Sequence, residues 1–514
     1  MTLARAPARP LNRWSIVVLA AALVIGAGLH FWQLTTKSLF LDEGFSIFLG
    51  GTPLDGFLSR VAHNDVHPPL FYLFAHAAIS TLHWPREDYR WLTAPMGLVT
   101  ILATWALARR TFGDAVAAFA ALAVATAPLL VEFDRLFRMY APLAALTTAS
   151  WWVLAVAIEE EGAKRRAAWI VYGLLAISLP YVQYLGWFVV ASQLIYAATR
   201  IRNAWPAFVV AALAVAAFIP WIWALRVQFP QGGLVGRMAG ERFFWPSVGI
   251  YLLSGGGIPQ VSLQAPPEFY YFTTAAVATL LVAGAVIARK TLLPYWLLPI
   301  ALQVAITAAS SKNLSIPRYF VHLVPAVACA IAVVIVALLR TRARLAGVVV
   351  AASVLAVSVV SLSNLLLVPK YQTSDWYAVD LLLLSRERQS DILVFSQAMP
   401  FLIMRAYVSV RGHRAYAASL PKDVAGAIAY LDRWPDRRVW YVENQSDVVD
   451  PRRRILQHLR ATRPILGAWL QTHIEHESTV YIALFGPERR ARRRSGAVSL
   501  PVGSAKSVVV TTSK

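Results

Sequence analysis

The sequence contains few charged residues and almost no cysteine. Only 15% of its 514 residues are Asp, Glu, Lys or Arg, against about 25% in an average soluble protein, whereas 58% are hydrophobic. This balance excludes an ordinary soluble enzyme and a disordered chain, because so much apolar surface needs lipid around it. The one cysteine, Cys329, lies in an apolar run, which excludes a disulfide framework and a cysteine-based metal site.

The first 368 residues contain a series of long apolar runs. A helix that crosses a membrane needs about 20 mainly apolar residues. The runs that reach or approach this length are 14–34, 91–108, 114–131, 141–158, 167–180, 181–198, 205–223, 269–288, 291–309, 318–339 and 345–367. We therefore predict a polytopic α-helical membrane protein with about eleven transmembrane helices.

Two regions leave this count open, with twelve or thirteen helices as alternatives. The segment 67–84 is apolar, but it carries three histidines and opens with Pro68 and Pro69, which disfavour a continuous helix. We expect it to be a surface or re-entrant helix. The pair of short runs within 167–198 is separated only by Pro180 and the polar residues that follow.

The net charge of +21 predicts the orientation of the chain. Basic residues of membrane proteins collect in short cytoplasmic loops. If 67–84 does not span, the basic loops at 109–110, 164–166, 200–202, 289–290 and 340–344 fall on the same side as the N-terminus. We expect a bacterial inner-membrane protein with a cytoplasmic N-terminus, a first span that is not a cleaved signal, and a periplasmic C-terminal region.

The composition changes at about residue 369, after a membrane domain over 1–368 that includes an outer loop at 35–90. Strand-like segments at 391–396, 438–443 and 478–486 alternate with helix-like segments at 374–388, 421–434 and 450–463. This alternation is typical of a small α/β domain, here 369–487. The basic tail 488–514 is expected to be disordered, either solvated or touching anionic lipid.

The Gly- and Pro-rich outer loop 224–268 is too long for a simple connection. Loops of this length are usually functional or disordered. It is interpreted as a lid or an acceptor-binding loop, with a purely structural connection as the alternative.

Four polar clusters lie just outside the predicted spans, on the side opposite the basic loops. The first is the pair Asp42 and Glu43, about seven residues after the first span. Desolvation and mutual repulsion would raise one carboxyl pKa towards the range of a general base. The alternative is a polar helix cap.

The second cluster is Asp65 and His67, followed directly by the proline pair. A histidine held rigidly beside a carboxylate can bind a phosphate or a metal ion. The alternative is a turn followed by a proline-initiated helix.

The third cluster contains Glu132, Asp134, Arg135, Arg138 and Tyr140. The two arginines, three residues apart, are expected to share a helical face and to bind a lipid phosphate. An internal salt-bridge set with the two acids is the alternative.

The fourth cluster places Lys312 and Arg318 around a short outer loop. Both side chains suit a phosphate. They also suit simple interfacial anchoring, because long basic side chains extend readily towards the membrane surface.

These clusters resemble the motifs of a known family. The Asp-Glu pair, the run D-V-H-P-P-L at 65–70, the R-x-Y at Arg138 and the P-R-Y at Arg318 occur in the order found in GT-C membrane glycosyltransferases. The similarity is to the protein O-mannosyltransferase and aminoarabinose-transferase type (glycosyltransferase family 39-like) and covers about residues 10–368. Gln183 departs from the pattern, because many members carry histidine at this position.

The resemblance implies transfer of one sugar from a polyprenyl-phosphate donor to an extracytoplasmic glycan, lipid or protein, with inversion at the anomeric carbon. By this resemblance Asp42 is the catalytic base and Glu43 supports it. The donor phosphate is expected to contact His67, Arg138, Lys312 and Arg318, with Asp65, Asp134, Arg135 and Tyr140 in support.

By the same resemblance no cofactor is required. The absence of a nucleotide requirement fits the lack of a G-x-G-x-x-G or Walker pattern, and a divalent metal ion stays open. Nucleic acid is not an expected partner. The alternative function is a transporter or flippase of a lipid-linked sugar. Such proteins place polar groups near the bilayer midplane in repeated halves, whereas this sequence has charges at span ends and no visible repeat.

Overall fold

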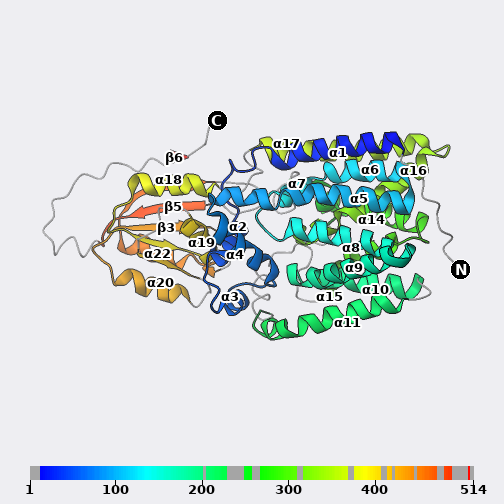
Figure 1. The fold of residues 1–514 in the computed structure, drawn as a ribbon. Coiled ribbons are helices and arrows are strands. Elements are labelled where there is room, and N and C mark those ends of the chain that lie inside the picture. The colour runs from blue at the N-terminus through cyan, green and yellow to red at the C-terminus, as the bar shows by residue number, and fades with distance from the viewer. Residues whose placement is uncertain are drawn as a thin grey trace. The chain divides into compact units, whose positions relative to one another are not determined.

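The computed structural model (Figure 1) describes residues 12–200, 204–228, 248–256, 267–309, 316–368, 375–406, 414–418, 423–444, 449–471, 480–488 and 508–509. The chain forms two compact units. The membrane unit comprises Met1–Leu34, Thr52–Trp84 and Asp88–Leu367. The soluble unit comprises Thr35–Gly51, Pro85–Glu87 and Val368–Lys514.

The membrane unit is built of helices. In chain order they are α1 Arg13–Phe31, α3 Phe57–Asn64, α4 Leu70–Leu82, η1 Arg86–Leu92 (whose first residues belong to the soluble unit), α5 Pro95–Phe112, α6 Asp114–Ala125, α7 Pro128–Asp134, α8 Tyr140–Glu159, α9 Gly162–Val182, α10 Gly186–Arg200, α11 Trp205–Phe218, η2 Ile219–Trp221, α13 Val248–Ser254, α14 Pro267–Ile287, α15 Leu293–Ala309, η4 Pro317–Leu323, α16 Val324–Leu339 and α17 Arg344–Leu367.

Seven helical stretches among the described residues are long and apolar enough to cross a membrane, and the bent pair α6 and α7 makes eight. Helix α16 forms the centre of this unit, since every residue from Val324 to Val336 is buried. The chain is therefore a multi-span membrane protein. The count of eleven spans stays a prediction.

Three of the predicted runs differ in detail from the helices observed. The run 114–131 is divided into α6 and α7, which meet at 52°, because Pro128 cannot continue the first helix. The segment 67–84 forms α4, a helix of 13 residues that begins after the proline pair. The run 167–198 is two helices as predicted, but α9 continues through Pro180 and ends at Val182.

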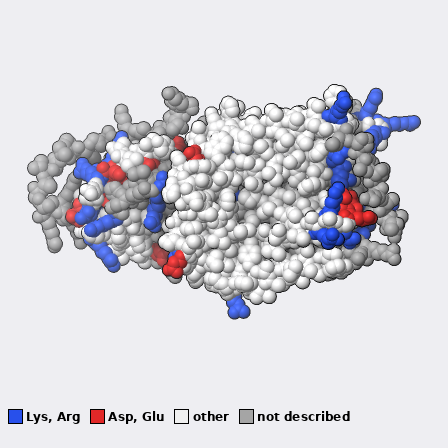
Figure 2. Space-filling model, in the orientation of Figure 1, with Lys and Arg blue, Asp and Glu red and all other residues white. Residues whose placement is uncertain are grey.

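Lys and Arg residues gather at one end of the helical bundle, beyond a broad band without charge (Figure 2). Ion pairs join the loops there. Arg109 bonds Asp114 at 3.0 Å, and Arg110 bonds Glu159 at 2.8 Å and Glu160 at 3.1 Å. These loops therefore share one end of the bundle, as the charge pattern predicts.

The soluble unit contains a six-stranded sheet in the order β2-β1-β3-β5-β4-β6. Strands β2, β1 and β3 are parallel, β5 is antiparallel to both β3 and β4, and β6 is parallel to β4. The strands are β1 Ile392–Phe395, β2 Arg414–Ala417, β3 Val439–Glu443, β4 Ile465–Gln471, β5 Val480–Phe485 and β6 Val508–Val509. Strands β1 and β3 are buried along their whole length, which is why they read as continuous apolar runs.

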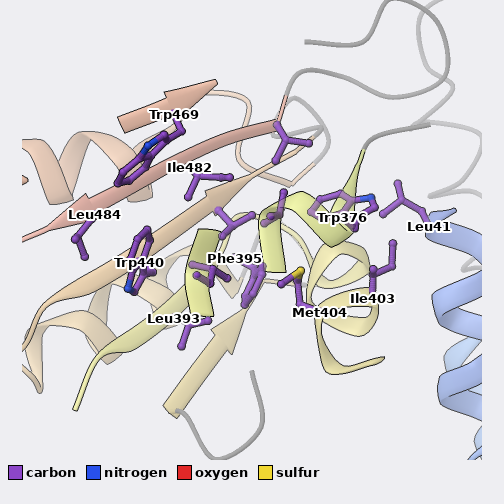
Figure 3. Packing of buried hydrophobic residues seen from close by; sticks show 14 of the residues in the cluster. Leu41, Trp376, Leu393, Phe395, Ile403, Met404, Trp440, Trp469, Ile482 and Leu484 are labelled. Carbon is purple, nitrogen blue, oxygen red and sulfur yellow. The ribbon is translucent and has the colours of Figure 1, made fainter. Parts of the chain in front are cut away.

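Helices cover both faces of this sheet. Helices α18 Trp376–Arg386, α19 Ala398–Ala406 and α2 Leu41–Gly50 share one core, in which Leu41 lies near Trp376 and Ile403 (Figure 3). Helices α20 Asp423–Asp432 and α22 Arg454–Thr462 pack on the opposite face. The segment 35–51, which lies before most of the membrane helices in the sequence, is therefore part of the soluble unit.

The predicted α/β domain is observed, with additions. The three predicted strands correspond to β1, β3 and β5, and the three predicted helices to α18, α20 and α22. The sequence did not predict β2, β4 or α19. Apart from Glu488 and the residues of β6, the predicted disordered tail lies outside the described residues, as do the predicted loop residues 229–247 and 257–266.

Candidate active site

The pair Asp42 and Glu43 occupies the first turn of α2 in the soluble unit. Glu43 is fully buried, and its Oε2 accepts the backbone amide of Phe40 at 2.8 Å, closing the start of the helix. Asp42 is only partly buried. The two carboxylates therefore differ, since Glu43 fixes the helix start while Asp42 presents the more accessible oxygens.

A glycine allows α2 to lie against α19. A Cβ at Gly44 would meet Ile403 Cγ1 at 2.5 Å and Ile403 Cα at 3.0 Å, closer than real Cβ contacts. The close approach buries Leu41 with Ile403. This packing sets the direction in which the first turn of α2 projects Asp42.

In the membrane unit, Asp65 holds His67. The Nδ1 of His67 lies 3.0 Å from Asp65 Oδ1 and 3.1 Å from Oδ2. Because an ionised carboxylate only accepts hydrogen bonds, Nδ1 carries a proton, and Nε2 is the ring nitrogen left for another ligand. The backbone amide of Val66 also donates to Asp65 Oδ1 at 2.7 Å, so the histidine is oriented by a rigid turn.

Tyr72 and Arg138 complete this cluster. The Tyr72 hydroxyl donates to Asp65 Oδ2, and Arg138 Nη1 donates to the same hydroxyl at 2.9 Å. The Arg138 guanidinium also lies 5.9 Å from the Tyr72 ring and 6.0 Å from the Tyr140 ring. A cation and a histidine are thus brought together from segments 70 residues apart in the chain. The name "histidine cluster" is used below for Asp65, His67, Tyr72 and Arg138.

The charge of Asp65 is maintained by its neighbours. Burial raises its pKa, but His67, Arg138 and the hydrogen bond from Tyr72 together lower the pKa to about 2. Asp65 is therefore an anion throughout the neutral range.

A series of hydrogen bonds from Gln228, Tyr184 and Trp221 fixes the backbone of His67. Gln228 Nε2 donates to the His67 carbonyl at 3.1 Å, and Gln228 Oε1 accepts from the Tyr184 hydroxyl. Trp221 Nε1 donates to the same hydroxyl at 2.8 Å. Gln183, the departure from the family pattern, accepts the backbone amide of Tyr184 at 2.8 Å and so fixes the start of this chain.

The prediction that Arg135 and Arg138 share a helical face is wrong. Helix α7 ends at Asp134 and α8 begins at Tyr140, so neither arginine is helical. Arg135 donates to the carbonyls of Trp32 and Gln33, at the end of α1. Of the two arginines, Arg138 therefore joins the histidine cluster, whereas Arg135 ties the third cluster to the first span.

The two acids of the same segment have other partners. Asp134 is fully buried and its Oδ2 lies 3.3 Å from His30 Nε2, while His30 Nδ1 lies 2.8 Å from the Gly26 carbonyl. Glu132 Oε2 accepts the amide of Gly256 at 2.8 Å, at the end of α13. Asp134 thus anchors α7 to α1, and Glu132 anchors the described part of the long outer loop to α7.

The fourth predicted cluster is only partly described. Arg318, in η4, is half-buried and its guanidinium lies 5.9 Å from the Tyr319 ring. Lys312 lies outside the described residues. Across the described ranges, no three His, Cys, Asp or Glu side chains are grouped as metal ligands would be.

The sequence did not predict Tyr72, which belongs to the histidine cluster, or Gln228, which contacts it. Tyr72 has one available signal, since it is the single tyrosine in an apolar helix that begins five residues after Asp65. Gln228 lies in no motif, and only its position in space links it to His67.

Comparison with known proteins identifies the fold. Residues 66–223 match the family model described as dolichyl-phosphate-mannose-protein mannosyltransferase. No curated protein sequence matches the chain. Three members of the histidine cluster, His67, Tyr72 and Arg138, lie within the matched segment.

Solved structures match the chain at low identity over most of its length. ArnT from Cupriavidus metallidurans is 13% identical, with a TM-score of 0.53 in the apo state, covering 91% of this chain and 97% of that one. Its structure bound to undecaprenyl phosphate gives a TM-score of 0.52, with 13% identity over 91% and 98% of the two chains. The Archaeoglobus fulgidus oligosaccharyltransferase tethered to an acceptor peptide gives 0.51, with 12% identity over 91% and 74%. The chain therefore has the GT-C glycosyltransferase fold, and the resemblance inferred from the motifs is confirmed.

Proposed function

We propose that this protein transfers one sugar from a polyprenyl-phosphate donor to an acceptor outside the cytoplasm, with inversion at the anomeric carbon. The observation that carries the proposal is the histidine cluster, in which Arg138 and His67 are fixed beside a buried tyrosine and a half-buried carboxylate. A phosphate leaving group needs a positive charge such as that of Arg138, because negative charge develops on its oxygens as the bond to the sugar breaks. The similar ArnT fold has been solved with undecaprenyl phosphate bound.

The proposed reaction is a single displacement. The oxygen or nitrogen of the acceptor bonds to the anomeric carbon as the bond from that carbon to the phosphate oxygen breaks. Asp42 accepts the acceptor proton, and the electron pair of the broken bond leaves with the polyprenyl phosphate. Arg138, His67, Arg318 and Lys312 are proposed to bind that phosphate, and Asp65 and Tyr72 to hold the first two of them in place.

The proposed setting is the bacterial inner membrane. The basic loops share one end of the bundle, and they are expected to face the cytoplasm. The acceptor is a glycan, a lipid or a protein on the other side. The oligosaccharyltransferase with a similar fold has been solved with a tethered acceptor peptide.

Asp42→Asn tests this function directly. The variant keeps the size and hydrogen-bonding capacity of the side chain but removes the base, so transfer is expected to fall about 10²- to 10⁴-fold. The measurement is release of labelled sugar from a polyprenyl-phosphate sugar incubated with purified protein and candidate acceptors. Thermal unfolding and binding of the donor should stay as in the wild type.

Asp55→Asn is the matched control, because Asp55 is an exposed aspartate on a loop and its loss should leave transfer unchanged. Full transfer by Asp42→Asn would show that Asp42 is not the base. Movement of the lipid-linked sugar across vesicles without its cleavage would instead support a transporter.

A further inference from the structure

A group of buried polar side chains in the membrane unit has no hydrogen-bond partner within the described residues. It comprises Thr147, Trp151, Trp296, Gln303 and His322, each with none of its surface exposed. The unpartnered atoms are the Thr147 hydroxyl, both indole nitrogens, both polar atoms of the Gln303 amide and both ring nitrogens of His322. Buried polar atoms in folded proteins almost always have partners, so this group needs an explanation.

Three elements bring these side chains together. The rings of Trp151 in α8 and Trp296 in α15 lie 6.4 Å apart, so these faces of the two helices meet. Thr147 is one turn from Trp151, and Gln303 is two turns from Trp296, on the same faces of their helices. His322 lies in η4, which packs against both α8 and α15. All of them therefore line one region between α8, α15 and η4.

This region lies next to the proposed phosphate site. Helix α8 begins two residues after Arg138, and Thr147 is about 10 Å further along its axis. His322 follows Arg318 by four residues. Helices α8 and α15 run in opposite directions, because the end of α10, which lies near Glu159 at the end of α8, bonds Tyr295 at the start of α15. Thr147 and Gln303 therefore both lie on the Tyr140 side of the tryptophan pair.

Several buried polar groups close to these residues in the sequence do have partners. The Tyr172 hydroxyl donates to Gln193 Oε1 at 3.1 Å, and Gln193 Nε2 donates to Ser150 Oγ at 2.7 Å. Thr148, the neighbour of Thr147, donates to the Ala144 carbonyl at 2.9 Å. Unpartnered atoms also occur elsewhere in the unit, as at Trp169 and Ser361, but Thr147, Gln303 and His322 share one region near η4.

The chemistry of the group selects a neutral ligand with hydroxyl groups. It contains no charged residue, which disfavours an anion. It combines donors and acceptors in one place, and it has two indole rings whose faces are apolar and whose N–H groups donate. Hydroxyl groups match such a site, because each can donate and accept at once.

We propose that Thr147, Gln303 and His322 bind hydroxyl groups of the sugar carried by the polyprenyl-phosphate donor, so that they select the sugar while Arg138 and His67 bind its phosphate. This inference rests on the proposed function. The unpartnered atoms lower the stability of the ligand-free protein, and the arriving sugar gives them their hydrogen bonds.

The test measures the affinity of the purified full-length protein for two kinds of lipid. One is bare short-chain polyprenyl phosphate, and the other is the same lipid carrying a glucosyl, mannosyl or arabinosyl group on its phosphate. In Thr147→Val and Gln303→Leu, affinity for the sugar-bearing lipid bound best by the wild type should fall about tenfold. Affinity for the bare polyprenyl phosphate should not change, and the ligand-free proteins should unfold at the wild-type temperature or above it, since an unpaired buried group has been removed.

Thr148→Val is the control, because its hydroxyl bonds its own helix and should not contribute to sugar affinity. Equal affinity of wild type and both variants for the sugar-bearing lipid would overturn the inference, as would an equal loss for both lipids. In those cases water molecules are the partners of the group. A wild-type protein that binds none of the lipids would instead refute the proposed function itself.

Discussion

At the scale of single residues, Asp65 organises the candidate site. It accepts hydrogen bonds from His67, from Tyr72 and from the backbone of Val66. Its replacement would leave the imidazole free to rotate and would deprive Tyr72 of its acceptor. A short acidic side chain two residues before a histidine thus orients two of the four proposed phosphate ligands, His67 directly and Arg138 through Tyr72.

Acid should destabilise the protein through Asp65. Its pKa in the folded state is about 2, below the ordinary value of 3.8. The ionised side chain therefore stabilises the fold fully above about pH 4, and this contribution, about 2 kcal/mol, is lost as the pH falls towards 2. Thermal unfolding in detergent between pH 6 and 2 measures it. Asp65→Asn should lack this component, and identical pH profiles for the two proteins would contradict the assignment.

Removal of one hydroxyl should weaken donor binding. Tyr72→Phe loses the bond to Asp65 and the bond from Arg138 while keeping the ring that packs beside the guanidinium. The KM for the polyprenyl-phosphate donor is expected to rise about tenfold, because Arg138 loses its fixed orientation. Steady-state kinetics give the value. Tyr377→Phe, at an exposed position of α18, is the control, and an unchanged KM in Tyr72→Phe would exclude the tyrosine from this role.

The sequence could predict the site residues that carry charge, but not their partners. Asp65, His67 and Arg138 stand out because charged groups near a membrane need a reason to be there. Arg135 met the same criterion, yet it bonds the carbonyls at the end of α1. Tyr72 and Gln228 were missed because an apolar helix and a motif-free segment give no local signal of what they face.

At the scale of elements, a glycine determines how α1, α5 and α7 meet. A Cβ at Gly97 in α5 would lie 2.5 Å from His30 Nε2 and 2.9 Å from Asp134 Oδ2. The buried pair of His30 and Asp134 fits between the helices only because this position has no side chain. The three helices thus meet through the polar contact between His30 and Asp134, and the absence of a side chain at Gly97 makes room for that contact.

Gly97→Ala should therefore destabilise the membrane unit. The added methyl group must displace His30 or Asp134, at a cost of about 1–3 kcal/mol. Thermal unfolding in detergent measures the loss. Gly28→Ala is the matched control, because a Cβ there meets nothing within 4 Å and alanine favours the helix. Equal stability of Gly97→Ala and Gly28→Ala would show that the contact is not close.

Element prediction succeeded where the apolar pattern is local. The strands β1, β3 and β5 are buried apolar runs, and their positions follow from composition alone. Strand β2 has no fully buried residue, and β4 contains Gly467 and an irregular register at Ile465, so neither reads as a buried apolar run. The bend between α6 and α7 had a signal in Pro128, which the length of the apolar run concealed.

At the scale of the whole molecule, the proposed orientation can be tested with cysteine probes. The natural sequence has one cysteine, Cys329, which is fully buried. In intact cells, a membrane-impermeant maleimide should label Arg433→Cys in the soluble unit and should not label Lys164→Cys in a basic loop, because we expect that loop to face the cytoplasm. Lysed cells, in which both variants should react, provide the control. Labelling of Lys164→Cys alone in intact cells would show that the orientation is the opposite of the one proposed.

Hydropathy alone identified a multi-span protein, but it could not fix the number of spans. Seven or eight described stretches meet the length and composition of a membrane span, whereas the sequence predicted eleven. The difference arises from helices such as α10 and α15, which are shorter than a typical span. Hydropathy also could not assign α2 to the soluble unit, because that assignment depends on residues near the other end of the chain.

The place of α2 in the soluble unit has a consequence for biosynthesis. The hydroxyl of Ser38 accepts the backbone amide of Trp376 at 2.9 Å, across 338 residues of chain. A ribosome that adds about 5–20 residues per second needs roughly 17–70 s to make that interval. During this time Leu39 and Leu41, just before and at the start of α2, have been translated while their core partners in α18 and α19 have not. The segment 35–51 can therefore pack into the soluble unit only after α18 and α19 have been synthesised. A nascent chain that stalls before Trp376 leaves this hydrophobic segment exposed to chaperones and proteases.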